Sequence, residues 1–257
     1  MKISVIGAGN VATHLIPKLD KHGHQIVQVF NRKITKARKL ARQVGATAHK
    51  EYSELNKKID LLLIIVSDDA ISTVAENLKK HLKRSSIVVA HTSGSTSSKV
   101  LKDFKNFGVF YPLQSFRMVE EKDWDNIPVL VNANTIANKK KIEKLAQSLS
   151  LKSFRKSDSQ RKSIHLSAVI LNNFINHLFC LNSEWLENSK SDFSLLIPLI
   201  QKTIENAQKE DPCNIQTGPA KRNDQTTIKK HLSSLKEFPE LYSIYSIFSA
   251  NITKKYL

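Results

Sequence analysis

The side chain in this sequence best suited to moving a proton near neutral pH is His165, one of nine histidines. It belongs to a narrow polar stripe on a helix predicted over residues 158–187, with Asn173 and His177 at its flank. The stripe consists of Arg161, His165, Asn172 and Asn176. On a long helix such a stripe can face a substrate cleft, where His165 donates a proton, or it can face solvent. The sequence leaves both interpretations open.

A second candidate region is the polar loop His91-Thr92-Ser93-Gly94-Ser95, which follows the fifth predicted strand. A loop that follows a strand of a parallel sheet lies at the edge where such sheets bind ligands, so we assign His91 and Thr92 to the binding of a cofactor. Ser93 and Ser95 can hold a substrate carbonyl or carboxylate, with Ser93 a candidate for a catalytic role. Gln114, beyond the kink at Tyr111-Pro112, approaches the same space. The alternative is a plain turn that binds nothing.

The start of the chain carries the GxGxxG/A pattern of a dinucleotide-binding turn, Gly7-Ala8-Gly9-Asn10-Val11-Ala12. Gly7 permits the tight turn, Gly9 lets the backbone approach a pyrophosphate, and Ala12 allows close packing of helix on strand. The pattern follows a strand and opens a helix, whose free N–H groups can bind the anion. The residues assigned to the cofactor here are Gly7, Ala8, Gly9, Asn10 and Val11.

The end of the second predicted strand indicates which dinucleotide binds. NAD-binding proteins usually carry an acidic residue there for the ribose 2′-hydroxyl, but this strand ends Asn31-Arg32-Lys33, without an acid. Arginine pairs with a 2′-phosphate, and Asn31 can hydrogen-bond without repelling it. The prediction is NADP(H), and the alternative is a solvated basic turn. The fourth strand ends in three further cofactor candidates, Val66, Ser67 and Asp68, of which Asp68 can instead cap the next helix.

Short apolar strands alternate with amphipathic helices in the first half of the chain, as in an α/β fold with a parallel sheet. The expected strands are 2–6, 25–30, 46–48, 60–66, 86–90, 108–111, 129–132 and one near 153. The expected helices are 10–23, 36–44, 68–82 and 136–149, then 158–187, 193–209, 222–234 and 238–256. The predicted fold is therefore α/β, with a Rossmann doubly wound, mainly parallel sheet over 1–155 and an all-α domain over 156–257.

Composition restricts the class of protein. The chain has 257 residues, enough to bury a core without disulfides, and its two cysteines form no metal-binding pattern. No segment reaches ~18–20 consecutive apolar residues, and the first residues run directly into a strand pattern. We therefore expect a cytoplasmic protein without a membrane partner or a bound metal. The net charge of +17 is spread along the chain, which argues against a specific nucleic-acid partner.

Longer motifs carry a family resemblance. They are the loop His91 to Ser95, Val109-Phe-Tyr-Pro-Leu-Gln-Ser-Phe116, His165-Leu-Ser-Ala-Val-Ile-Leu-Asn-Asn-Phe174 and Gln216-Thr-Gly-Pro-Ala-Lys-Arg-Asn-Asp224. Through them the whole chain resembles a family of bacterial oxidoreductases that join a Rossmann-like domain to a helical domain of unknown function, of the DUF2520 type. More widely, the chain is similar to 6-phosphogluconate dehydrogenase-like proteins, among them pyrroline-5-carboxylate reductase and ketopantoate reductase.

This resemblance implies a helical C-terminal domain like that of 6-phosphogluconate dehydrogenase, which supports a homodimer and contributes side chains to the substrate site. Related hydroxyacid dehydrogenases place a lysine and an asparagine on the equivalent helix, which makes Asn173 a candidate catalytic residue. This stretch has no lysine after Lys162, so the resemblance does not extend to a lysine acid–base mechanism.

The turn Gln216-Thr217-Gly218-Pro219 lies between two predicted helices. With Arg222 and Asp224 behind it, this turn can close over an anionic substrate, or these two residues can simply flank and cap the next helix. The candidate substrate contacts along the chain are Ser95, Gln114, Asn172, Thr217, Gly218 and Arg222.

Together these features predict hydride transfer between NADPH and a small carbonyl or imine substrate that carries a carboxylate, with a proton from His165. The rival hypothesis is a sensor or interaction protein that keeps the cofactor fold without chemistry. Substrate-dependent oxidation of NADPH distinguishes the two, because a sensor does not catalyse it.

Overall fold

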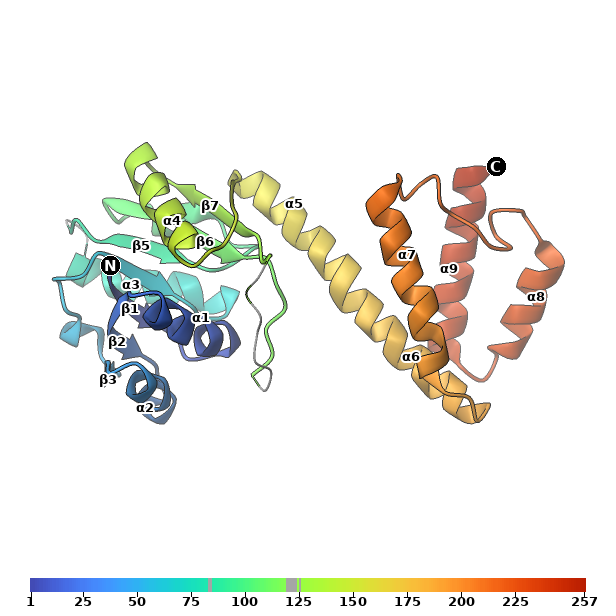
Figure 1. The fold of residues 1–257 in the computed structure, drawn as a ribbon, viewed down its shortest axis with the longest axis horizontal. Helices are drawn as coiled ribbons and strands as arrows, with labels where there is room; N and C mark the ends of the chain where they lie inside the picture. The colour runs from blue at the N-terminus through green and yellow to red at the C-terminus, as the bar shows by residue number, and fades with distance from the viewer. Residues whose placement is uncertain (83–84, 119–123, 125) are drawn as a thin grey trace. The chain divides into compact units, whose positions relative to one another are not determined.

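The computed structural model describes the chain except residues 83–84, 119–123 and 125. In the part that it describes, the chain forms two compact units, Met1–Val169 and Ile170–Leu257 (Figure 1). The first unit is an α/β sandwich and the second is helical, which confirms the predicted fold class. The domain boundary at residue 155 remains a prediction.

The first unit is built on one eight-stranded sheet. Its strand order is β3-β2-β1-β4-β5-β6-β7-β8, and every neighbouring pair is parallel except β6 with β7. The strands are β1 (Lys2–Ile6), β2 (Gln25–Phe30), β3 (Thr47–His49), β4 (Leu61–Ile64), β5 (Val88–His91), β6 (Asn106–Pro112), β7 (Val129–Ala133) and β8 (Ser153–Arg155). The order β3-β2-β1-β4-β5 is that of a Rossmann fold, whose connections change direction between β1 and β4. Ligands of such folds bind at the carboxyl ends of these two strands.

Helices cover both faces of this sheet. One face packs against α1 (Asn10–Lys21), α2 (Ile34–Gln43) and α4 (Ile136–Ser148), and the other against α3 (Asp68–Leu82) and the 3-10 helix η2 (Ser98–Leu101). All four residues of β4 are buried, as expected for an unbroken apolar strand between two helical layers. A second 3-10 helix, η1 (Tyr52–Glu54), which the sequence did not predict, follows β3.

A long helix begins at Asp158 with a capping box. The Ser157 hydroxyl accepts the Gln160 backbone N–H at 3.2 Å, and the Gln160 side chain accepts the Ser157 N–H at 3.0 Å. The segment α5 (Asp158–Ala168) then passes into a π-helical turn, Val169–Phe174, before α6 (Ile175–Asn188). A π-helical turn holds more residues than an α-helical turn, so it interrupts the regular spacing on which the polar stripe was predicted.

The second unit continues with the 3-10 helix η4 (Phe193–Leu196), α7 (Ile197–Lys209), α8 (Gln225–Ser234) and α9 (Pro239–Tyr256). Helix α8 starts later than the predicted residue 222. The reason is that Asp224 is the cap of this helix, and its carboxylate accepts the Thr227 N–H at 3.0 Å.

The helix Asp158–Asn188 is, by length and composition, apolar enough to cross a membrane. It has 31 residues, and its most apolar 18-residue window has a mean hydropathy of 1.4 with none of it buried within the chain. One such helix is only weak evidence for a membrane span, because core helices of proteins without a membrane span meet the same criteria of length and composition.

Candidate active site

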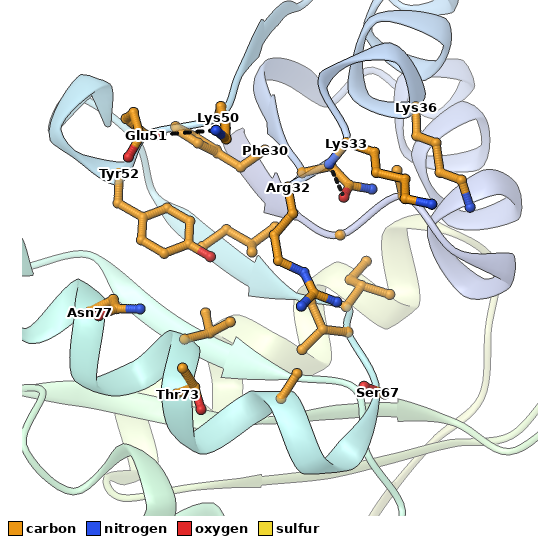
Figure 2. A pocket seen from close by; sticks show the side chains of 18 of the residues that line it. Phe30, Arg32, Lys33, Lys36, Lys50, Glu51, Tyr52, Ser67, Thr73 and Asn77 are labelled. Atoms are coloured by element: carbon orange, nitrogen blue, oxygen red, sulfur yellow. Dashed lines mark hydrogen bonds and ion pairs between the residues drawn. The ribbon is translucent and has the colours of Figure 1, made fainter.

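A cleft of about 1230 Å³ opens at the carboxyl ends of β1, β2 and β4 (Figure 2). Gly7 forms part of its floor with a φ of +118°, and a Cβ on Gly7 would lie 1.8 Å from the backbone oxygen of Ile65. Only glycine fits this turn, because both the conformation and the close approach exclude a side chain. Gly9 is extended and directly precedes α1, whose first N–H groups are free for an anion.

The rim of this cleft is basic. Asn31 replaces the acidic residue typical of NAD sites, and its side-chain oxygen accepts the Lys33 N–H at 3.1 Å. Figure 2 shows Lys33 and Lys36 on one side of the cleft, Tyr52 on the other, and the Arg32 side chain extending between them. Arg32 and Tyr52 both line the cleft. Burial raises the pKa of the Tyr52 phenol, and the positive charge of Arg32 opposes this shift.

Seven of the residues assigned to the cofactor line this cleft: Gly7, Ala8, Asn31, Arg32, Lys33, Val66 and Ser67. The other assigned residues, Gly9, Asn10, Val11, Asp68, His91 and Thr92, are not among those that line it. Gly9, Asn10 and Val11 form the start of α1, where the Asn10 amide donates to the Phe116 carbonyl at 2.9 Å. His91 and Thr92 end β5, and the His91 side chain is fully buried, so only its backbone can approach a ligand.

A second group of side chains surrounds the loop after β5. The Tyr111 hydroxyl, from β6, lies 2.9 Å from Nδ1 of His165, from α5, and the two rings meet edge-on with centroids 5.7 Å apart. Both rings pack directly on Gly94, since a Cβ there would lie 2.5 Å from His165 Nδ1 and 2.7 Å from Tyr111 Cζ. Asp68, at the start of α3, accepts a hydrogen bond from the Ser95 hydroxyl. The structure therefore brings the Ser93–Ser95 loop and His165 together.

An ion pair fixes the first turn of α5 to this loop. The Asp158 carboxylate accepts from the Ser97 hydroxyl at 2.6 Å, the Ser98 N–H at 2.8 Å and the Arg161 guanidinium at 2.7 Å. Arg161 is 1% exposed and also donates to the Thr96 carbonyl. Although burial opposes ionisation, these donors hold the pKa of Asp158 well below its usual range. The network determines where α5 starts and thereby places His165 over Gly94.

The remaining site candidates of the first unit are held differently. The Ser93 hydroxyl is engaged within its own loop, where it donates to the Thr96 hydroxyl and accepts the Thr96 N–H, both at 2.9 Å. Gln114 is exposed, and its side-chain oxygen accepts the Ser115 N–H at 2.8 Å. In the described part of the chain, the side chains of Ser93 and Gln114 make no other hydrogen bonds, so these contacts do not indicate which ligand they would bind.

The other candidates belong to the second unit. Asn172 and Asn173 are exposed in the π-helical turn and hydrogen-bond each other at 3.4 Å. Thr217 and Gly218 line an apolar cavity of about 550 Å³ among α6, α8 and α9. Arg222 is exposed just before α8.

Sequence reasoning missed several side chains that the structure places in these two groups. Tyr111 and Asp158 were not assigned a role, and Arg161 was assigned only to the polar stripe. The aromatic Tyr111 at the carboxyl end of a strand was the available signal, because that edge of a parallel sheet carries ligand sites. Among the described residues, no group of three or more His, Cys, Asp or Glu side chains could hold a metal ion.

We expect the buried His91 to make the free energy of unfolding depend on pH. Burial lowers its pKa to about 4, with a further contribution from the positive charge of Arg161. An unfolded chain takes up a proton at His91 near pH 6.5 while the folded chain does not, so the free energy of unfolding should fall between about pH 6.5 and pH 4, by on the order of 3 kcal/mol. Urea unfolding across this range measures the slope. It should flatten in His91→Asn, and an equal slope in both proteins contradicts this assignment.

Comparisons with known proteins identify the family of each part of the chain. Residues 2–94 match the family of coenzyme F420-dependent NADP oxidoreductases, and residues 127–252 match the domain of unknown function DUF2520. No curated protein sequence matches the chain.

Solved structures extend the likeness over the whole chain. A candidate NADP oxidoreductase from Bacteroides fragilis is 33% identical, with 98% of each chain covered and a TM-score of 0.88. An imine reductase from Myxococcus stipitatus in complex with NADP⁺ shares the fold at 15% identity, with 99% of this chain and 93% of that chain covered and a TM-score of 0.70. A pyrroline-5-carboxylate reductase from Coxiella burnetii shares it at 18% identity, with 99% and 97% covered and a TM-score of 0.59. The chain therefore belongs to the family of NADP-dependent oxidoreductases in which a Rossmann domain precedes a DUF2520 helical domain.

Proposed function

We propose that this oxidoreductase transfers a hydride between NADPH and a small carbonyl or imine substrate that carries a carboxylate, and that His165 supplies the proton. The observation that carries this proposal is the hydrogen-bonded pair of His165 and Tyr111, which lies at the carboxyl edge of the sheet that also forms the basic cleft. Imine and pyrroline-5-carboxylate reductases among the structural neighbours support the substrate class.

The residues of the cleft fit a dinucleotide phosphate. Gly7 makes the tight turn against the Ile65 carbonyl, Gly9 has no atom within 4 Å of the place of a Cβ, and the start of α1 offers backbone N–H groups to a pyrophosphate. Arg32 and Lys33 offer positive charge to a 2′-phosphate, with no acidic residue at the end of β2 to repel it. When bound, NADPH supplies the hydride.

The protein supplies the proton and the orientation. In this proposal the protonated His165 ring gives its Nε2 proton to the substrate oxygen or nitrogen and becomes neutral. Asn173 remains a proposed catalytic residue. Ser93 stabilises the loop on which His165 packs, because its hydroxyl donates to the Thr96 hydroxyl. It remains a proposed catalytic residue. The proposed substrate contacts are Ser95, Gln114, Asn172, Thr217, Gly218 and Arg222, of which Arg222 can pair with the carboxylate.

The test is a spectrophotometric assay of NADPH oxidation with the purified protein and a panel of small keto acids and cyclic imines. Turnover of a member of the panel, lost without that member, supports the oxidoreductase mechanism. Binding of NADPH without turnover of any carbonyl or imine compound supports the sensor alternative instead.

Arg32→Ala is expected to weaken NADPH binding by about 10- to 100-fold and NADH binding little, because it removes a charged hydrogen bond to the 2′-phosphate. Calorimetric titration with both dinucleotides measures the ratio. The matched control is Arg38→Ala on the exposed face of α2, which should leave both affinities unchanged. Equal affinity of the native protein for NADPH and NADH contradicts the assignment.

We also propose a homodimer formed through the second unit, whose helices expose many large apolar side chains. These are Ile170, Leu171, Phe174, Ile175, Leu195, Ile197, Leu199, Ile204, Tyr242, Ile247 and Phe248. So much exposed apolar surface is unusual for a soluble monomer and typical of an interface. Light scattering without detergent should give twice the 29.1 kDa chain mass. A mass of 29.1 kDa, or recovery only with detergent, contradicts the dimer.

A further inference from the structure

We infer that Tyr111 is a positioning residue that holds the neutral His165 ring in the tautomer with its proton on Nε2. The catalytic consequence of this inference rests on the proposed role of His165, but the tautomer itself does not. The inference starts from the 2.9 Å contact between the Tyr111 hydroxyl and His165 Nδ1. A neutral imidazole has one donor and one acceptor nitrogen, so the direction of this hydrogen bond fixes which nitrogen carries the proton.

The hydroxyl is the donor in this contact. In the described part of the chain it has no other acceptor, and a partly buried phenol that only accepted would leave its own proton without a partner. The phenol also keeps its proton, since burial and the negative charge of Asp68 raise the pKa of Tyr111 to about 12, against the opposing charge of Arg161. A protonated phenol that donates to Nδ1 leaves the imidazole proton on Nε2.

The surroundings keep the two rings in this arrangement. Gly94 lies under both rings, which meet edge-on at 78°. Two charged groups act on the Tyr111 phenol: Asp68, which accepts a hydrogen bond from the Ser95 hydroxyl, and Arg161, which is paired with Asp158. Neither of them has a hydrogen bond to the imidazole among the described contacts, so Tyr111 alone selects the tautomer.

The consequence concerns Nε2, the nitrogen proposed to act on the substrate. Nε2 carries a proton in the imidazolium and in the tautomer that Tyr111 selects, but not in the alternative neutral tautomer. By excluding that alternative, Tyr111 keeps Nε2 of the neutral ring as a hydrogen-bond donor that can hold the substrate oxygen or nitrogen. In the charged ring Nδ1 also carries a proton, and there the Tyr111 oxygen accepts instead. A histidine that is free to exchange tautomers would spend part of its time unable to donate.

Long-range ¹H–¹⁵N correlation spectra of the ¹⁵N-labelled full chain test the tautomer directly, at a pH where His165 is neutral. The His165 signals are identified by their absence in His165→Gln. We expect Nδ1 at the shift of an unprotonated nitrogen and Nε2 at that of a protonated one. In Tyr111→Phe, which keeps the ring but removes the hydroxyl, both shifts should move towards the tautomer mixture of free histidine. A protonated Nδ1 in the native chain, or unchanged shifts in Tyr111→Phe, overturns the inference.

The second unit offers a matched control. The Tyr245 hydroxyl lies 2.8 Å from Nδ1 of His231, with the rings edge-on at 80°. Tyr245→Phe should therefore move the His231 signals and leave those of His165 in place. A change at His165 in this variant would mean that its tautomer responds to some effect other than its own tyrosine, which counts against the inference.

Turnover separates this inference from the proposed function. Tyr111→Phe should lower kcat by roughly tenfold, in line with the loss of one neutral hydrogen bond, with an unchanged Kd for NADPH. If the tautomer shifts but neither Tyr111→Phe nor His165→Gln affects kcat, the proposed role of His165 fails and the tautomer assignment stands. If His165→Gln is inactive while Tyr111→Phe keeps full kcat, the positioning role is wrong.

Discussion

His165→Gln is expected to lower kcat by about 10²- to 10⁴-fold, the range that a positioned general acid contributes. Glutamine keeps a polar side chain near the Tyr111 hydroxyl but cannot deliver a proton near neutral pH. The dissociation constant for NADPH should stay unchanged, because His165 is not among the residues that line the cofactor cleft. Steady-state kinetics with the substrate found in the assay panel, together with calorimetry, measures both quantities.

The control for this variant is His22→Gln. The His22 ring hydrogen-bonds the Lys18 carbonyl at the end of α1, away from both groups of site residues. The kcat of His22→Gln should therefore equal that of the native protein. A kcat in His165→Gln within twofold of the native value would remove His165 from the mechanism. A weaker affinity for NADPH as the only effect would instead assign His165 to the cofactor.

Asp158→Asn is expected to destabilise the protein by about 3–5 kcal/mol, because it leaves the charge of Arg161 buried without its partner. The guanidinium is 1% exposed, and the carbonyl of Thr96 alone does not neutralise it. Urea unfolding measures the loss as a lower midpoint. The exposed Asp20→Asn on α1 is the control and should be close to neutral.

A double variant tests the cause of this loss. Adding Arg161→Met to Asp158→Asn removes the unpaired charge and should restore part of the stability, since an apolar side chain is tolerated where an isolated cation is not. No recovery in the double variant would show that the hydrogen bonds of Asp158 to Ser97 and Ser98 matter more than the ion pair.

The ion pair also predicts a pH dependence below that of His91. The pKa of Asp158 is depressed in the folded state, so its contribution is fully present above the unfolded value of about 3.9 and is lost as the pH falls below that value. His91 acts at higher pH, between about 6.5 and 4. Unfolding curves should therefore show two successive losses, of which Asp158→Asn removes only the lower one.

The sequence predicted the features that depend on local patterns. The strand, glycine turn and helix around Gly7 form the expected nucleotide-binding unit, and the basic end of β2 lines the cleft as expected. The helices and strands of the first unit lie close to their predicted ranges. These elements could be predicted because their signals, the spacing of apolar residues and the glycines at turns, lie within a few residues of the structure that they specify.

The sequence did not predict contacts between distant segments. Tyr111 and His165 are 54 positions apart, and the contact between them depends on the alignment of α5 with the loop after β5. The π-helical turn Val169–Phe174 has no local signature, since its residues are as compatible with a regular α-helix. The polar stripe was therefore predicted on the wrong spacing, and of its four members only Arg161 is buried.

The contact of two rings on Gly94 has a consequence for natural variation in this family. Gly9 and Gly218 have no atom within 4 Å of the place of a Cβ, so space does not restrict those positions. At position 94, by contrast, any side chain would displace the histidine, the tyrosine or both. A relative with alanine there has to shift or replace at least one of the two rings, so positions 94, 111 and 165 should covary across evolution.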